Sequence, residues 1–223
     1  MLVVGLTGGI ASGKSTAAEI LRGQGAAVVS SDVLAREAVA PGEPALEAIV
    51  SAFGASALAP DGTLDRRALG RRVFADPEAL ARLEAILHPE IRARTLRALR
   101  ALQRTGQPAA VCEIPLLFEV GLHLPGSFID QIWLVYVPEQ EQVRRLVLRE
   151  GLHPEEARRR LRAQWPMERK RPLADVVVDN TGPWEDLADQ VLRAWEAVLV
   201  SAPRYPGLRG VPRNDTKEGR RSR

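Results

Sequence analysis

Residues 8–15 read Gly-Gly-Ile-Ala-Ser-Gly-Lys-Ser and match the phosphate-loop pattern G-x-x-x-x-G-K-[ST]. Glycines let successive backbone N–H groups turn inward around a phosphate, at the positive end of the helix that follows. Lys14 supplies a cation for the β- and γ-phosphates, and the Ser15 hydroxyl is the expected Mg²⁺ ligand. The alternative is a glycine-rich turn with an incidental lysine. We predict a nucleoside triphosphate site made of Gly8, Gly9, Ile10, Ala11, Ser12, Gly13, Lys14, Ser15 and Thr16.

The class of phosphate-loop protein must come from other residues, because GTPases, motor ATPases and small-molecule kinases share this loop. The chain has no N-K-x-D motif, which would indicate guanine specificity. No hydrophobic strand ends in Asp-Glu as in motor ATPases, and Glu113 is the nearest approximation. Both absences favour a kinase.

Asp32 follows the second apolar run, at the edge of a parallel sheet where ligands bind in open α/β folds. A carboxylate there could accept the proton of an attacking hydroxyl or hold Mg²⁺ through water. The alternative is that Asp32 caps a helix beginning at Val33. We favour the catalytic interpretation.

An arginine-rich stretch runs from Gln142 to Lys170 and predicts a mobile helical lid. Arg145 and Arg149 lie four residues apart, so they share one face of the predicted helix. Cations on that face could close over the transferring phosphoryl group and exclude water. For most of the other arginines, Arg159 among them, we favour a solvated face balanced by neighbouring glutamates.

The remaining candidates are weak. His88 precedes a proline and is more often a capping or packing residue than a catalyst. The three histidines have no metal-ligand spacing. Cys112 lies in an apolar run and is predicted to be an inert buried thiol.

The elements that must position these residues alternate between strand and helix. The first 32 residues spell strand, loop, helix and strand, a βαβ unit that requires a parallel sheet. We predict strands at 2–7, 26–32, 131–138 and 174–180, and helices at 15–25 and 184–199. Residues 109–119 also have strand character, interrupted by a loop at Pro115.

Residues 33–104 have helical periodicity and exceed what one crossover needs, so we predict an inserted helical subdomain in which His88-Pro89 kinks or splits a helix. The predicted fold class is α/β: a five-stranded parallel sheet flanked by helices, with the insertion and a helical lid. The core takes 1–32, 105–142 and 172–200, the acceptor domain 33–104, the lid 143–171 and a disordered basic tail 201–223.

Composition and charge limit the partners. The net charge is +3, but the tail from Pro203 onward carries seven basic and two acidic residues, so residues 1–202 carry −2. This speaks against a basic nucleic-acid-binding face. No apolar run reaches the roughly 20 residues of a membrane helix. The lone Cys112 excludes an intrachain disulfide, and we expect a cytoplasmic protein.

The order of several short motifs resembles the dephospho-coenzyme A kinase family over about residues 1 to 200. The motifs are GLTGGIASGKST, Ser31-Asp32, His88-Pro-Glu-Ile, Pro115-Leu-Leu-Phe-Glu119, Gln142-x-x-Arg145-x-x-x-Arg149, Arg160-x-x-x-Gln164 and Ala174-Asp-x-x-x-Asp-Asn180. The resemblance implies that ATP, with Mg²⁺, phosphorylates the ribose 3′-hydroxyl of dephospho-CoA in the last step of coenzyme A synthesis.

The resemblance also implies roles for individual residues. Asp32 would be the catalytic carboxylate beside Lys14, Arg145 would contact the phosphates, and the loop after Asn180 would form part of the adenine pocket. Acceptor-binding residues would be His88, Leu116, Glu119 and Arg149. Two departures concern the family's frequent Asp-Ala-Asp, here Ser30-Ser31-Asp32, and its frequent Asp at the position of Glu113.

The partners expected are therefore ATP and dephospho-CoA, for a monomer or weak oligomer with no nucleic acid and no membrane. Two alternatives remain open at this point. One is a kinase for another acceptor, such as a nucleoside monophosphate or a small metabolite. The other is an ATP-regulated nucleic-acid-binding protein that uses the arginine-rich tail.

Overall fold

A computed structural model describes residues 1–74 and 76–202 of the chain, so the predicted tail from residue 203 lies outside the described residues. The elements in chain order are β1 (Leu2–Gly8), α1 (Lys14–Gly23), β2 (Ala27–Ser30), α2 (Ser31–Glu37), α3 (Pro44–Phe53), the 3₁₀ turn η1 (Ala55–Ala57), α4 (Arg66–Phe74), α5 (Pro77–Arg104), β3 (Ala109–Glu113), β4 (Gln131–Tyr136), α6 (Glu139–Glu150), α7 (Pro154–Leu161), α8 (Met167–Lys170), the 3₁₀ turn η2 (Arg171–Leu173), β5 (Val176–Asp179) and α9 (Trp184–Ser201). No described helix is long and apolar enough to cross a membrane.

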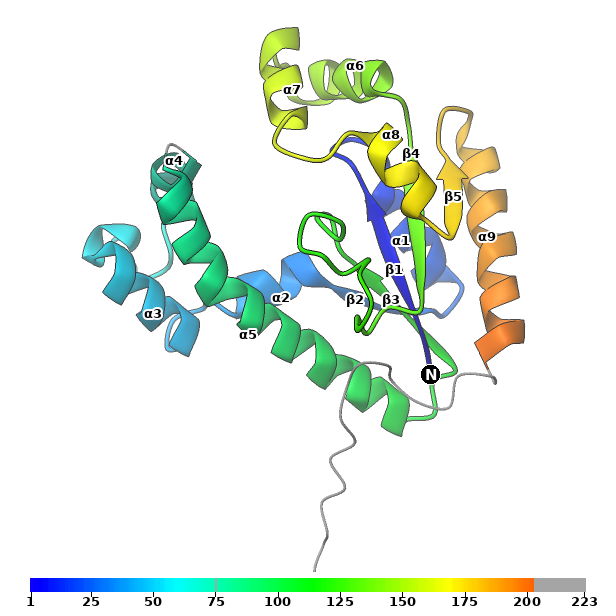
Figure 1. The fold of residues 1–223 in the computed structure, drawn as a ribbon, viewed down its shortest axis with the longest axis horizontal. Coiled ribbons are helices and arrows are strands. Elements are labelled where there is room, and N and C mark those ends of the chain that lie inside the picture. Colours follow the sequence, from blue (N-terminus) through cyan, green and yellow to red (C-terminus); the bar gives the residue numbers. More distant parts are fainter. Residues whose placement is uncertain (75, 203–223) are drawn as a thin grey trace, which may run out of the picture.

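The sheet has five strands in the order β2-β3-β1-β4-β5, and every neighbouring pair is parallel. This confirms the predicted α/β fold with a parallel sheet. Parallel strands all end at one edge, so the chain leaves β1, β2, β3 and β5 toward the same side of the molecule (Figure 1). That edge therefore collects the phosphate loop, Asp32, Glu113 and Asn180.

Both faces of the sheet are covered, as a parallel sheet requires. Alternate residues of β1 serve the two faces: Leu2, Val4 and Leu6 pack with α1 and α9, whereas Val3 packs on the opposite face. That second face is covered by the carboxyl-terminal half of α5, the loop after β3 and α8 (Figure 1). Both faces of the sheet are therefore buried in hydrophobic clusters.

The insertion between β2 and β3 is helical, as predicted, and has a hydrophobic cluster of its own from α3, η1, α4 and the first half of α5. Arg94 of α5 adds a polar contact, because its guanidinium pairs with Glu43, the residue before α3. Its Nε also donates to Glu90 Oε1 at 2.7 Å. The insertion therefore has its own internal packing beside the sheet.

Helix α5 runs through Pro89 as one helix, so it is not split at His88-Pro89, which is one of the two outcomes expected there. Proline removes one helical hydrogen bond and costs about 3 kcal/mol in a helix interior. Packing on both sides offsets this cost: Leu83 and Leu87 join the insertion's cluster, and Leu96 and Leu99 join the sheet's. The Asp76 carboxylate also caps the helix start by accepting from Glu78 N and Ala79 N.

The charged stretch after β4 folds into three helices, α6, α7 and α8. Gly151 ends α6 with φ of 65°, and Pro154 is the first residue of α7. At the carboxyl end, α9 reaches Ser201 and Ala202 is buried in the sheet's cluster. Those two residues, expected in the tail, therefore belong to the folded body.

Candidate functional site

The phosphate loop joins β1 to α1 at the carboxyl edge of the sheet. Gly13 is the N-cap of α1 with φ of 94°, and the first turn of α1 holds no acidic residue. The positive end of the helix dipole is thus left for an anion. Within the described residues, Ala11 is the one non-glycine residue with positive φ, at 60°. The loop therefore turns tightly into the first residue of α1.

Two glycines of the loop are required by close neighbours. A Cβ on Gly13 would lie 2.1 Å from Asn180 Nδ2, and one on Gly8 would lie 2.4 Å from Ser12 Oγ. Asn180 Nδ2 donates to Ser12 O at 2.7 Å, from the loop that follows β5. The segment predicted to approach the adenine therefore also fastens the phosphate loop.

A buried carboxylate faces the start of α1. Glu113, the last residue of β3, is 7% exposed. Its Oε1 accepts from Lys14 Nζ at 2.6 Å and from Ser15 Oγ at 3.4 Å, while Arg22 approaches Oε2 at 3.5 Å. The glutamate thus contacts both polar side chains that the phosphate loop offers to a nucleotide and its cation.

Asp32 lies in the first turn of α2, and Ser30 is the N-cap, so the alternative interpretation of Asp32 as a helix cap is wrong. The chain leaves its extended conformation at Ser30 and enters the helix at Ser31, two residues before the expected start at Val33. The Asp32 side chain is exposed and makes no hydrogen bond or ion pair with the described residues. It is therefore available to a bound molecule.

Asp32 lies on the rim of a cavity of about 450 Å³ between the insertion and the sheet. The cavity is lined mainly by apolar side chains of the loop after β3, and α5 contributes Ile91 and three polar or charged side chains. Its lining residues are Ser31, Asp32, Ala35, His88, Ile91, Arg92, Thr95, Ile114, Pro115, Leu116, Val120, Leu122, Phe128 and Gln164. Two of the residues predicted for the acceptor side, His88 and Leu116, are among them.

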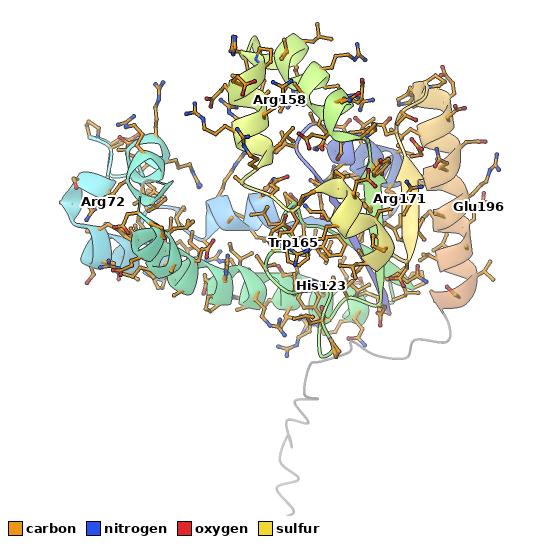
Figure 2. The ribbon with its side chains drawn as sticks, turned by 45° about the horizontal axis from the view of Figure 1, so that its top comes forward. Arg72, His123, Arg158, Trp165, Arg171 and Glu196 are labelled. Carbon is orange, nitrogen blue, oxygen red and sulfur yellow. The ribbon has the colours of Figure 1, made fainter. Side chains whose placement is uncertain are left out.

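Glu119 and Arg149, the other two predicted acceptor residues, are not brought to this cavity. Glu119 Oε1 accepts from Trp165 N at 2.8 Å and lies 2.8 Å from Nζ of the fully buried Lys170. It fastens the end of the lid segment to the loop after β3, where Trp165 lies near His123 (Figure 2). Arg149 is exposed and pairs with Glu150.

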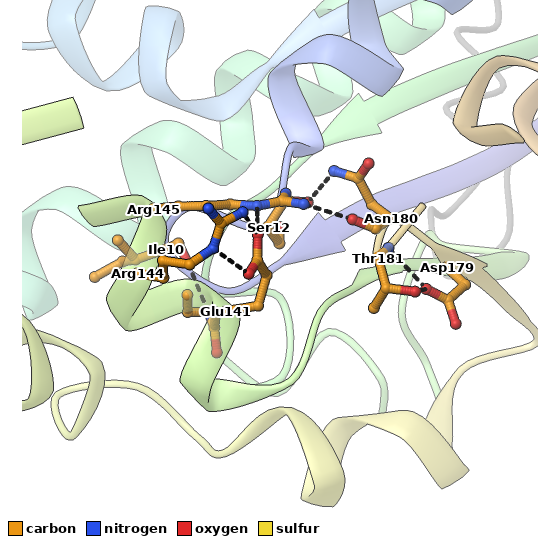
Figure 3. A network of polar contacts seen from close by, with 9 residues as sticks. Ile10, Ser12, Glu141, Arg144, Arg145, Asp179, Asn180 and Thr181 are labelled. Atoms are coloured by element: carbon orange, nitrogen blue, oxygen red, sulfur yellow. Dashed lines mark hydrogen bonds and ion pairs between the residues drawn. The ribbon is translucent and has the colours of Figure 1, made fainter. Parts of the chain in front are cut away.

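Arg145 of α6, the arginine predicted to contact the phosphates, lies against Asn180 and Glu141 (Figure 3). Its NH2 donates to Asn180 O at 2.6 Å, and its Nε donates to Glu141 Oε1 at 2.7 Å. Hydrogen bonds from Arg144 and then Arg145 lower the pKa of Glu141 from 4.5 to about 2. A carboxylate that stays ionised holds the Arg145 guanidinium beside the phosphate loop.

Most of the other arginines of the predicted lid face solvent, in agreement with the predicted solvated face. They pair with glutamates one turn away: Arg144 with Glu141, Arg158 with Glu155, and Arg159 with Glu156. Figure 2 shows Arg158 on the outer side of α7, away from the sheet. Exposed pairs of this kind contribute about 0–1 kcal/mol each.

Two glutamines at the phosphate loop were not predicted as site residues. Gln142 Nε2 donates to Ile10 O at 2.6 Å, and Gln164 Oε1 accepts from Ile10 N at 3.1 Å. Both occur in the motifs that carry the family resemblance, which was the only signal the sequence offered. They come from the two ends of the α6–α7 segment and meet at one residue, Ile10, on the two peptide groups that flank it.

Metal and thiol chemistry are limited in the described residues. They contain no group of three or more His, Cys, Asp and Glu side chains that could hold a metal by themselves. Cys112 is buried, as predicted, and burial raises the pKa of its thiol to about 12.

Comparisons with known proteins agree on one family. The family model described as dephospho-CoA kinase matches residues 2–186. The dephospho-CoA kinase of Geobacter metallireducens is 48% identical over 204 residues, covering 92% of this chain and all of that protein. The dephospho-CoA kinase of Anaeromyxobacter dehalogenans is 51% identical over 193 residues, covering 86% of this chain and 90% of that protein.

Solved structures give the same result. TT1252 from Thermus thermophilus superposes with a TM-score of 0.74 at 45% identity, covering 88% of this chain and 96% of that one. The dephospho-CoA kinase from Campylobacter jejuni superposes with a TM-score of 0.68 at 30% identity, covering 89% of this chain and 98% of that one.

Proposed function

Because this chain belongs to the dephospho-CoA kinase family and phosphorylates dephospho-CoA with ATP, we propose that transfer to the ribose 3′-hydroxyl takes place between its phosphate loop and the cavity beside Asp32. The observation that carries this proposal is the position of Asp32. It is exposed on the rim of the cavity and follows β2 at the sheet edge that also holds the phosphate loop. A hydroxyl bound in the cavity can thus face the carboxylate and the γ-phosphate together.

ATP is proposed to bind across residues 8–16, with its phosphates at the N-terminus of α1. Backbone N–H groups and the Lys14 ammonium would stabilise charge on the β- and γ-phosphates. Arg145 would add a second cation from the lid side, because its guanidinium already lies against the loop at Asn180. The loop after Asn180 would contact the adenine.

Asp32 is proposed as the group that accepts the proton of the attacking hydroxyl or orients that hydroxyl. An unpaired, exposed carboxylate suits this role better than Glu113, which is occupied by Lys14 and Ser15. The transfer is largely a matter of positioning and charge stabilisation, so the orientation of the hydroxyl matters as much as its proton.

The donor atoms around Ser15 fit Mg²⁺, which prefers oxygen ligands and keeps several waters. The Ser15 hydroxyl and the Glu113 carboxylate lie 3.4 Å apart, and we propose that Ser15 holds the ion with the nucleotide while Glu113 supports it. When bound, Mg²⁺ would neutralise charge on the β- and γ-phosphates.

The insertion, residues 33–104, is proposed as the acceptor domain. The insertion's helix α5 contributes Ile91 and Arg92 to the cavity, whose apolar wall comes mainly from the loop after β3. The Arg92 guanidinium lies 5.6 Å from the centre of the Phe128 ring. An apolar wall suits a base or a pantetheine arm, and a cation suits the diphosphate between them. His88 and Leu116 would line this acceptor side.

A coupled assay of ADP release tests the proposal. Dephospho-CoA should raise ADP release far more than AMP, CMP or shikimate at equal concentration. Analysis of the product should place the new phosphate on the ribose 3′-oxygen. Faster turnover with one of the other acceptors would contradict the acceptor assignment and favour a kinase of different specificity.

A further inference from the structure

The peptide group on the amino side of Ile10 and the carbonyl of Ile10 are held from two sides by glutamine side chains. Gln164 Oε1 accepts from Ile10 N at 3.1 Å, and Gln142 Nε2 donates to Ile10 O at 2.6 Å. Ile10 precedes Ala11, whose φ of 60° is disfavoured for a residue with a Cβ. The two glutamines therefore fix the least relaxed part of the phosphate loop.

The two glutamines differ in their surroundings. Gln142 is 3% exposed and packs under the loop, where a Cβ on Gly9 would lie 2.4 Å from its Nε2. Gln164 is half-buried and follows α7 at the end of the lid segment. Gln142 is thus a fixed support, whereas Gln164 can respond to what lies beside it.

Gln164 lies between two binding regions. One side of its amide contacts Ile10 of the phosphate loop, and the residue also lines the acceptor cavity beside Asp32 and His88. Among the described residues that line this cavity, Gln164 is the one that forms a hydrogen bond with residues 8–16. An occupant of the cavity therefore meets a side chain already bound to the phosphate loop.

We propose that Gln164 is a positioning residue that couples occupancy of the acceptor cavity to the orientation of the Gly9–Ile10 peptide group. An acceptor packed against Gln164 restricts its rotamers and keeps Oε1 on Ile10 N–H, which holds the loop in shape for transfer. The inference rests on the proposed function, because it assigns this cavity to the acceptor. Its consequence is that transfer to acceptor is favoured over transfer to water.

Three variants separate this role from a structural one. Gln164→Met and Gln142→Met each keep side-chain length and remove one bond to Ile10. Gln131→Met is the matched control, because within residues 1–74 and 76–202 the Gln131 Oε1 accepts from Trp133 Nε1 on β4 alone, outside the phosphate loop and the cavity. For each purified enzyme, ADP release is measured with and without dephospho-CoA, together with the Kd of a non-hydrolysable ATP analogue and the Tm.

For Gln164→Met we expect acceptor-dependent kcat to fall about tenfold or more, which corresponds to about 1.4 kcal/mol. ADP release without acceptor should fall by a smaller factor than acceptor-dependent kcat, and the Kd of the analogue should rise by a smaller factor than acceptor-dependent kcat falls. For Gln142→Met both turnovers should fall by a similar factor, because this support does not depend on the acceptor. Gln131→Met should keep both turnovers within twofold of wild type.

The inference is overturned if Gln164→Met keeps acceptor-dependent kcat within twofold of wild type. It is also overturned if Gln164→Met lowers ADP release with and without dephospho-CoA by the same factor. The same holds if the Kd of the ATP analogue rises as much as acceptor-dependent kcat falls, because Gln164 would then affect nucleotide binding alone. A wild-type enzyme that does not respond to dephospho-CoA would contradict the proposed function itself, and the inference with it.

Discussion

Glu113 Oε1 lies 2.6 Å from Lys14 Nζ, so the cation of the phosphate loop has a buried carboxylate as its counter-ion. The Lys14 side chain is only 10% exposed, and the Glu113 side chain is 9% exposed. When a triphosphate binds at this loop, the Lys14 ammonium must therefore either contact both the phosphates and Glu113 or move away from Glu113. The pair also makes Lys14 a contributor to stability, which the sequence alone does not suggest.

Lys14→Ala should lower kcat at least about 10²-fold, because it removes the cation on the β- and γ-phosphates. It should also lower the Tm, since Glu113 keeps only Ser15 and the more distant Arg22. The double variant Lys14→Ala/Glu113→Gln should recover the Tm but not kcat. Near-normal turnover in Lys14→Ala would remove the basis of the proposed phosphate site.

Asp32→Asn should lower kcat by roughly 10²–10⁴, because the amide cannot accept the proton of the hydroxyl. The Tm should stay almost unchanged, because Asp32 makes no hydrogen bond or ion pair with the described residues. The variant would lose only the interaction of the carboxylate charge with the N-terminus of α2, about 0.3–1 kcal/mol. Binding of ATP should be retained. Phosphorylation of dephospho-CoA within threefold of wild type would mean that another group orients the hydroxyl.

Arg145→Ala should lower kcat more than it weakens acceptor binding, because its charge is used mainly in the closed transition-state complex. Arg159→Ala is the control, since Arg159 is 75% exposed and pairs with Glu156 on the same helix. Its kcat should stay near wild type. Equal losses in the two variants would indicate that the lid acts through net charge.

The lowered pKa of Glu141 predicts that the free energy of unfolding decreases at acid pH. Its folded pKa of about 2 lies below the ordinary 4.5, so its contribution is present above about pH 4.5 and is lost as the pH falls toward 2. Thermal unfolding of wild type and Glu141→Gln, compared at pH 5.5 and pH 3, should therefore differ less at the lower pH. Glu139→Gln on the same helix is the control, and a Glu141→Gln deficit independent of pH would refute the assignment.

Much of the sheet could be predicted because its signals are local. The β1 run, the glycines and the helix after them define a βαβ unit, and the parallel order then follows from chain connectivity. Pro89 shows the limit of such signals. A proline argues for a break, yet leucines on both sides of it pack into two different clusters and hold the helix together.

The candidate site could be predicted as far as it follows the ends of strands. Asp32 and Asn180 are polar residues that each follow an apolar run, so the sequence predicts that both lie at the carboxyl edge of the sheet. Gln164 is not, because its contact with Ile10 spans 154 residues and depends on how the lid folds back. The surroundings of Glu119 were unpredictable for the same reason, since its partners Trp165 and Lys170 come from that lid.

The continuity of α5 also bears on how the protein unfolds. One helix supplies leucines to the insertion's cluster and to the sheet's cluster, so neither can lose its packing without exposing part of the other. The two clusters should therefore melt in a single cooperative transition, with amide hydrogens on both sides of Pro89 exchanging at similar rates. A substitution deep in the insertion would then lower the amount of folded enzyme in the cell and leave the chemistry of each folded molecule intact.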